Sequence, residues 1–214
     1  MLLRNAVRVL AFAGFVAGAT PAFADAAGDF IIAVENDRTA QVREFLAKGI
    51  DPNSVSPTGE PAIVVAARAG SAASVDALLA AKANVNAKSP SGDTAIMAAA
   101  LSGHLELVKK LRTAGAQVDG PGWTPLIYAA TGGKDDVVQY LIAQGAKVNA
   151  VSPNGTSALM MAVREGKGST VTLLIARGAD VNQKNDGGAT ALAWAVRGNE
   201  QAMAEALRKA GAKN

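Results

Sequence analysis

A segment of twelve residues recurs along this chain and restricts its fold more than any other feature. GWTPLIYAATGG (122–133) begins with Gly, has Thr at its third place, an aliphatic residue at its fifth and Ala at its eighth. The pattern returns in GEPAIVVAARAG (59–70), GDTAIMAAALSG (92–103), GTSALMMAVREG (155–166) and GATALAWAVRGN (188–199). The third-place residues lie 33, 30, 33 and 33 residues apart: Pro61, Thr94, Thr124, Ser157 and Thr190. A fixed period in this range indicates a repeat array.

A second segment comes after each copy and predicts a helix. In VVQYLIAQGAKVN (137–149), Val137, Tyr140 and Leu141 fall on one helical face. Gly145 stands where that helix should end in a left-handed residue, and Lys82 occupies the same place in another copy. Each unit therefore reads as two short helices and a turn-rich link. A single helix pair cannot bury its apolar face, so the units must stack.

The third-place residue precedes an apolar run and is expected to cap the first helix of its unit. Thr is a good N-cap, and Pro125 beside Thr124 suits the first helical position, which needs no amide hydrogen. The links SVSPTGE, AKSPSGD and AVSPNGT consist largely of turn residues. The eighth-place Ala is small enough for helices of neighbouring units to approach closely.

Together these segments resemble the ankyrin repeat, whose signature is G-x-T-P-L-H-x-A-A, then G-H-x-E-x-V, then G-A-D-V-N. GWTPLIYAA (122–130), GHLELV (103–108) and GADVN (178–182) match it closely. The resemblance implies an all-α ankyrin-repeat solenoid of about six helix-turn-helix units with hairpin links. Its expected ranges are an N-terminal capping repeat (28–53), internal repeats (54–86, 87–119, 120–149 and 150–182) and a C-terminal capping repeat (183–214), within a domain spanning 25–214.

The chain departs from that signature in two ways. The His of T-P-L-H is replaced throughout, by Val64, Met97, Ile127, Met160 and Ala193. One link is also short, because six residues separate Val118 from Thr124, where nine separate Val85 from Thr94. We therefore expect a shortened hairpin finger there, with the helices themselves intact.

Residues 1–24 have the layout of a secretory signal peptide. A basic start precedes an uncharged apolar run of eleven residues (9–19), and Ala22-Phe23-Ala24 offers small residues at the positions a signal peptidase reads. A membrane anchor is the alternative, but a span needs about 20 apolar residues. We expect cleavage after Ala24 and a periplasmic location, with no membrane attachment afterwards; secretion is the alternative.

The sequence gives little support for a catalytic, cofactor-binding or metal-binding site. It has no Cys, and its single His, His104, sits where the ankyrin pattern itself supplies one. Asp135 and Asp136 begin a helix, where carboxylates stabilise the helix dipole. Residues 25–214 carry 19 Lys and Arg against 18 Asp and Glu, which gives no argument for nucleic acid. We therefore expect neither an enzyme nor a cofactor-binding, metal-binding or nucleic-acid-binding protein.

The resemblance instead implies a binding surface on the concave side, formed by the links and the exposed ends of the first helices. Trp123, on the short link, is the sharpest candidate, although it could instead fold over the gap left by the missing residues. The other candidates are Arg68, Leu101, Arg164, Arg197, Asp93 and Glu60. The three arginines could line one groove or be solvated. Tyr128 and Trp194, at the seventh place, are expected in the core.

The expected function is that of an exported, monomeric module that binds a periplasmic partner protein through this face. Small exported ankyrin proteins that the chain resembles are linked to peroxide defence, where they support or protect an enzyme, and others look like immunity proteins against toxins. A secreted effector that binds host proteins is the alternative.

Overall fold

The computed structural model describes residues 21–213, with the side chains of residues 26–213, and this part of the chain is built from helices alone. The twelve helices form six consecutive antiparallel pairs, so the predicted all-α repeat solenoid is confirmed. The pairs are α1 (Pro21–Glu35) with α2 (Thr39–Ala47), α3 (Ala62–Arg68) with α4 (Ala72–Ala80), α5 (Ala95–Ser102) with α6 (Leu105–Thr113), α7 (Pro125–Gly132) with α8 (Asp135–Ala143), α9 (Ala158–Arg164) with α10 (Gly168–Ala176), and α11 (Ala191–Arg197) with α12 (Gln201–Lys209).

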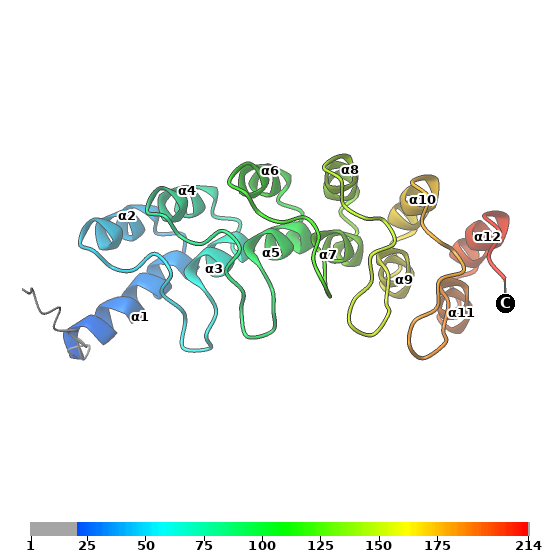
Figure 1. The fold of residues 1–214 in the computed structure, drawn as a ribbon, viewed down its shortest axis with the longest axis horizontal. Helices are drawn as coiled ribbons and strands as arrows, with labels where there is room; N and C mark the ends of the chain where they lie inside the picture. Colours follow the sequence, from blue (N-terminus) through cyan, green and yellow to red (C-terminus); the bar gives the residue numbers. More distant parts are fainter. Residues whose placement is uncertain (1–20, 214) are drawn as a thin grey trace, which may run out of the picture.

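The helices lie in two rows (Figure 1). The odd-numbered helices, here the inner helices, form one row, and the even-numbered outer helices form the other. Both rows bow so that the side carrying the inner helices and the links is concave. We call the exposed side of the inner helices and links the concave face. The link between α6 and α7 reaches less far than the others, as its three missing residues predicted.

The core is continuous through all six pairs and uses the same repeat positions each time. The eighth-place alanines of the inner helices are completely buried: Ala66, Ala99, Ala129, Ala162 and Ala195. The outer helices contribute a fully buried leucine at one place in each of five repeats: Leu78, Leu111, Leu141, Leu174 and Leu207. Full burial of one such side chain stabilises the fold by about 1.5–3 kcal/mol. The small residue lets the helices approach, and the large one fills the space between the rows.

The expected Thr or Ser cap forms in three repeats and fails in one. Thr124, Ser157 and Thr190 each accept a hydrogen bond from the backbone N–H three residues later, at 3.3, 3.4 and 3.1 Å. The prediction was wrong for Thr94, whose side chain makes no capping bond and whose Oγ1 is buried without a hydrogen-bond partner. The start of α5 therefore carries an unpaired polar atom that the start of α11 does not.

The outer helices end as the sequence predicted. Gly145 has a φ of 90° and Lys82 one of 71°, so both adopt the left-handed conformation. Gly132, inside α7, is constrained in another way. A Cβ atom there would overlap the backbone carbonyl oxygen of Leu101 in α5. Only a glycine allows α5 and α7 to pack at this separation.

Asparagines in the loops after the outer helices tie neighbouring repeats together. Asn86 accepts a hydrogen bond from Gln117 N at 3.0 Å and donates one to Gly115 O at 3.1 Å. Asn149 and Asn182 make the same pair of contacts with the next repeat along the chain. Asp119 takes this place in the repeat before the short link, and its carboxylate only accepts, from Lys147 N at 3.2 Å.

Apolar residues stand at the place where the signature has its histidine, and most of them are buried. Val64, Ile127 and Met160 at that place are buried, whereas Ala193 in the last repeat is exposed. The first helix begins before residue 28, the expected start of the N-terminal capping repeat. α1 begins at Pro21, four residues before the expected cleavage site, and residues 1–20 of the predicted signal peptide lie outside the described part of the chain.

Candidate protein-binding face

The concave face is hollowed at three places, and the most apolar of these lies at its centre. This central recess has a volume of about 190 Å³ and is lined by Leu101, Trp123, Tyr128, Thr131 and Met161. The inner helices α5, α7 and α9 each contribute to it, and Trp123 comes from the short link. Leu101 is 39% exposed and adjoins the partly buried Trp123 and Tyr128, so the recess has a contiguous apolar lining rather than a single exposed residue.

Trp123 is neither free in solvent nor buried. It packs on the core and against Tyr128, with ring centroids 5.9 Å apart and ring planes at 71°. Such edge-to-face pairs contribute about 0.5–1.5 kcal/mol beyond the area they bury. The short link thus brings Trp123 down onto α7, where it forms one wall of the recess.

The prediction that Tyr128 would be a core residue was wrong. Its ring is half-buried and lines the recess, and its hydroxyl donates a hydrogen bond to the Asp93 carboxylate on the preceding link. Burial of the phenol, followed by this hydrogen bond and the charge of Asp93, raises the pKa of Tyr128 above its ordinary value. The predicted candidate Asp93 therefore holds Tyr128 in place.

The C-terminal recess is larger and more charged. It has a volume of about 470 Å³ and is lined by Val163, Arg164, Trp194, Arg197, Gly198 and Glu200. Trp194 is half-buried here, so the expectation of a core residue was wrong for it as well. Arg164 is held by Glu165, at 3.0 Å from Nε to Oε1. Arg197 makes no ion pair within residues 26–213.

Arg68 lines a third hollow, the N-terminal recess, whereas the other two candidate arginines line the C-terminal recess. It is lined by Glu35, Glu60, Val65, Arg68 and Ala69. Arg68 pairs with both carboxylate oxygens of Glu60, with 3.1 Å between Nη1 and Oε2. The structure thus brings Arg164 and Arg197 together and places Arg68 elsewhere, where its charge is already matched.

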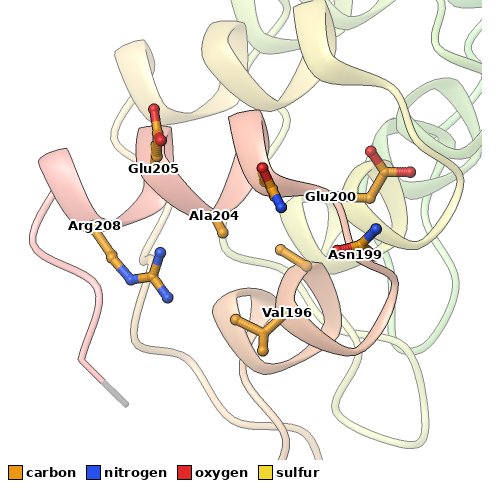
Figure 2. Close-up of a pocket in the computed structure, with 8 residues that line it drawn as sticks. Val196, Asn199, Glu200, Ala204, Glu205 and Arg208 are labelled. Atoms are coloured by element: carbon orange, nitrogen blue, oxygen red, sulfur yellow. The ribbon is translucent and has the colours of Figure 1, made fainter.

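Further hollows lie outside the concave face, at the two ends of the described solenoid. The one between α1 and α2 is lined by Ile32 and Phe45 among others, and the other lies between α11 and α12. Figure 2 shows Val196 of α11 and Ala204 of α12 facing it, with Glu205 and Arg208 toward one end and Asn199 and Glu200 toward the other. Val196 is 55% exposed, whereas Val163, at the same place in the preceding repeat, is 2% exposed. This hollow is therefore the surface that a stacked repeat covers elsewhere in the array.

Tyr128, Met161 and Trp194 are among the recess residues that the sequence did not single out as binding candidates. All three occupy the seventh place of the segment. The signal that could have found Tyr128 and Trp194 is the large aromatic residue at this place, because both rings are only half-buried, whereas Met161, Val65 and Ala98 are buried there. Leu101, Thr131, Arg164 and Arg197 share the tenth place.

His104 has a packing role. Its ring lies over Gly70 of the preceding repeat, where an added Cβ would meet it. Among the described residues, no group of His, Asp and Glu side chains is arranged to hold a metal ion. None of the described helices is long and apolar enough to cross a membrane.

Comparison with known families agrees with this geometry. The family model for ankyrin repeats (3 copies) matches three overlapping stretches, residues 30–120, 66–152 and 126–214. The chain therefore belongs to the ankyrin-repeat family. Ankyrin repeats indicate a protein–protein interaction module, and the family is typically non-catalytic.

Among curated proteins, the chain is similar to M-phase phosphoprotein 8 from rat, mouse and human. The identity is 50% over 42 residues. That stretch is 20% of this chain and only 5% of each relative.

Proposed function

We propose that the protein binds a partner protein through its concave face, with the central recess as the main contact. The observation that carries the proposal is the exposed Leu101 beside the half-buried Trp123 and Tyr128. Binding energy concentrates on such partly exposed aromatic clusters, where a few residues contribute most of it. Because the face is built from packed helices, little ordering is required on association.

The test is capture with matched variants. The full chain with a C-terminal affinity tag, as wild type, Leu101→Glu and Ile32→Glu, is incubated with an extract of its source cells. Ile32 is also an exposed apolar residue, but it lies in α1, outside the central recess. We expect wild type and Ile32→Glu to recover the same protein and Leu101→Glu to lose it. Equal recovery by all three variants would contradict the proposal.

The identity of the recovered protein decides between the roles that the resemblance suggests. An enzyme of peroxide metabolism would favour a supporting or protective role, and a toxin would favour an immunity role. Recovery of a protein only from host extract would favour the secreted-effector alternative.

We also propose that the protein acts in the periplasm after removal of residues 1–24. The basic start, the short apolar run and Ala22-Phe23-Ala24 support this. Among the side chains described from residue 26 on, the first buried one is Phe30, which lies after the expected cleavage site. Cell fractionation with N-terminal sequencing tests it. Periplasmic protein beginning at Asp25 is expected, and cytosolic protein with an intact N-terminus would disprove export.

A further inference from the structure

We infer that the concave face selects a polypeptide segment in which one large apolar side chain fills the central recess and a nearby Asp or Glu reaches Arg197. This inference rests on the proposed function and specifies the chemistry of the partner. It depends on three features: the lining of the central recess, the availability of Arg197, and the position of both recesses beside α9.

The central recess suits an apolar side chain because both of its side-chain hydroxyl groups are already hydrogen-bonded. The Tyr128 hydroxyl donates to Asp93, and Thr131 Oγ1 donates to Ile127 O at 2.8 Å. The rest of the lining is Leu101, Trp123 and Met161. A cavity of about 150 Å³ lined by such side chains accommodates a benzene molecule. The recess, at about 190 Å³, is therefore of the size of one Leu, Ile, Met or Phe side chain.

The walls of the central recess are held before any partner arrives. Tyr128 is fixed at its hydroxyl by Asp93 and along its ring by Trp123. Gly132 sets the separation of α5 and α7, which carry Leu101 and Tyr128. A preformed recess loses little conformational entropy when it is filled, so a single side chain can contribute substantially to affinity.

The charge of the neighbouring recess indicates which second group the ligand should carry. Arg197 is exposed and makes no ion pair within residues 26–213, whereas Arg68 is neutralised by Glu60. Glu200 also lines this recess, and Glu165 holds Arg164, so Arg197 is the guanidinium available to a ligand. Guanidinium groups pair well with carboxylates, which they can bind through two parallel hydrogen bonds.

The two recesses lie on either side of α9, which places Met161 in one and Arg164 in the other. Packed helices lie about 8–10 Å apart, so the recesses are separated by about one to two helix spacings. An extended segment covers that distance in about three to six residues. The expected ligand pattern is therefore an apolar residue and an acidic residue separated by about two to five others.

The test uses a phage library of random peptides of about twelve residues, long enough to reach both recesses. It is selected on the full chain, and the enriched peptides are titrated against variants whose helical content and thermal unfolding match wild type. Leu101→Glu and Arg197→Glu change the two recesses. Ile32→Glu and Arg177→Glu make the same changes at exposed positions outside them, and Arg177, like Arg197, lies at the end of a helix.

Enriched peptides are expected to share the apolar–acidic pattern. Leu101→Glu should weaken their binding by about tenfold or more, and Arg197→Glu by about threefold to tenfold. The two control variants should bind as wild type does. Peptides that lack the pattern, or that pair an apolar residue with a basic one, would overturn the inference. If such peptides remain sensitive to Leu101→Glu, the proposed function survives; if no enriched peptide responds to any change on the concave face, both fail.

Discussion

The central and C-terminal recesses are built from the same repeat, yet they differ in size and chemistry. At the centre the link is three residues short, and Trp123 lies on Tyr128, leaving about 190 Å³ with an apolar lining. At the C-terminal recess, the repeats have full-length links with Thr156 and Ala189 in the place of Trp123, and a hollow of about 470 Å³ remains between arginines. The comparison indicates that the length of one link changes the size and the polarity of the hollow that a repeat surface presents.

The largest expected effect comes from the helix contact that holds the central recess. Gly132→Ala places a Cβ against the backbone carbonyl of Leu101, which cannot move without shifting α5. We expect a loss of about 3 kcal/mol in the free energy of unfolding, at the upper end for overpacking. Gly168→Ala, at the start of α10, meets open space and should change stability by less than about 1 kcal/mol. Urea denaturation of both variants tests this, and equal effects would contradict the close approach of α5 and α7.

The second expected effect is a loss of stability that should differ between substitutions of the two tryptophans. Trp123→Ala removes both core packing and the edge-to-face contact with Tyr128, whereas Trp194 has no aromatic pair among the described residues. We expect Trp123→Ala to cost about 2 kcal/mol, and Trp194→Ala to cost less by about 0.5–1.5 kcal/mol. Thermal and urea unfolding measure the difference. A larger loss from Trp194→Ala would mean that the short link does not stabilise the centre.

The third expected effect is on the free energy of unfolding, and it should have opposite signs at the start of α5 and at the start of α11. Thr94, which begins α5, has a buried hydroxyl without a partner, whereas Thr190 caps α11 through Ala193 N. Replacing an unpaired buried hydroxyl by a methyl group removes a desolvation cost, so Thr94→Val should raise stability by about 1 kcal/mol. Thr190→Val should lower it by about 1 kcal/mol through loss of the cap. Two changes of the same sign in urea denaturation would show that Thr94 is paired in solution.

The smallest expected effect is a change in stability at alkaline pH that comes from the ionisation of Tyr128. The pKa of Tyr128 is raised in the folded protein, so above about pH 10, the ordinary tyrosine value, the unfolded chain loses a proton that the folded chain keeps. Stability must then fall as pH rises, by no more than about 1.4 kcal/mol per pH unit, which is the limit for a single proton. Partial exposure of the phenol keeps the total effect small. Tyr128→Phe should unfold with a weaker pH dependence than wild type between about pH 10 and 12. Identical profiles would contradict both the partial burial of the phenol and its hydrogen bond to Asp93.

Much of the molecule could be predicted from the spacing of a few residues. The period indicated the helix pairs, the eighth-place alanines indicated the close packing, and Gly145 and Lys82 indicated the left-handed helix ends. The short finger was also predicted by counting residues between Val118 and Thr124. These features are local or repeat at each unit, so a single chain displays them several times.

The candidate site was predicted only in outline. The concave candidates were named, but the assignment of Tyr128 and Trp194 to the core was wrong, and the alternatives for Trp123 could not be separated. Of the large side chains at the seventh place, Tyr128 and Trp194 are half-buried, whereas Met161 is buried. This difference depends on contacts with neighbouring repeats, which the sequence pattern does not specify.

The amino-acid sequence alone determined that this protein is a row of helix pairs, because the hydrophobic period, the glycines and the turn residues act within each unit. Only the tertiary structure decided which side chains meet across units. It paired Arg68 with Glu60, grouped Arg164 with Arg197, and joined Tyr128 to Asp93 and Trp123. Side-chain contacts between repeats depend on the distance and angle between stacked helices, and these are set by the packing of the whole array.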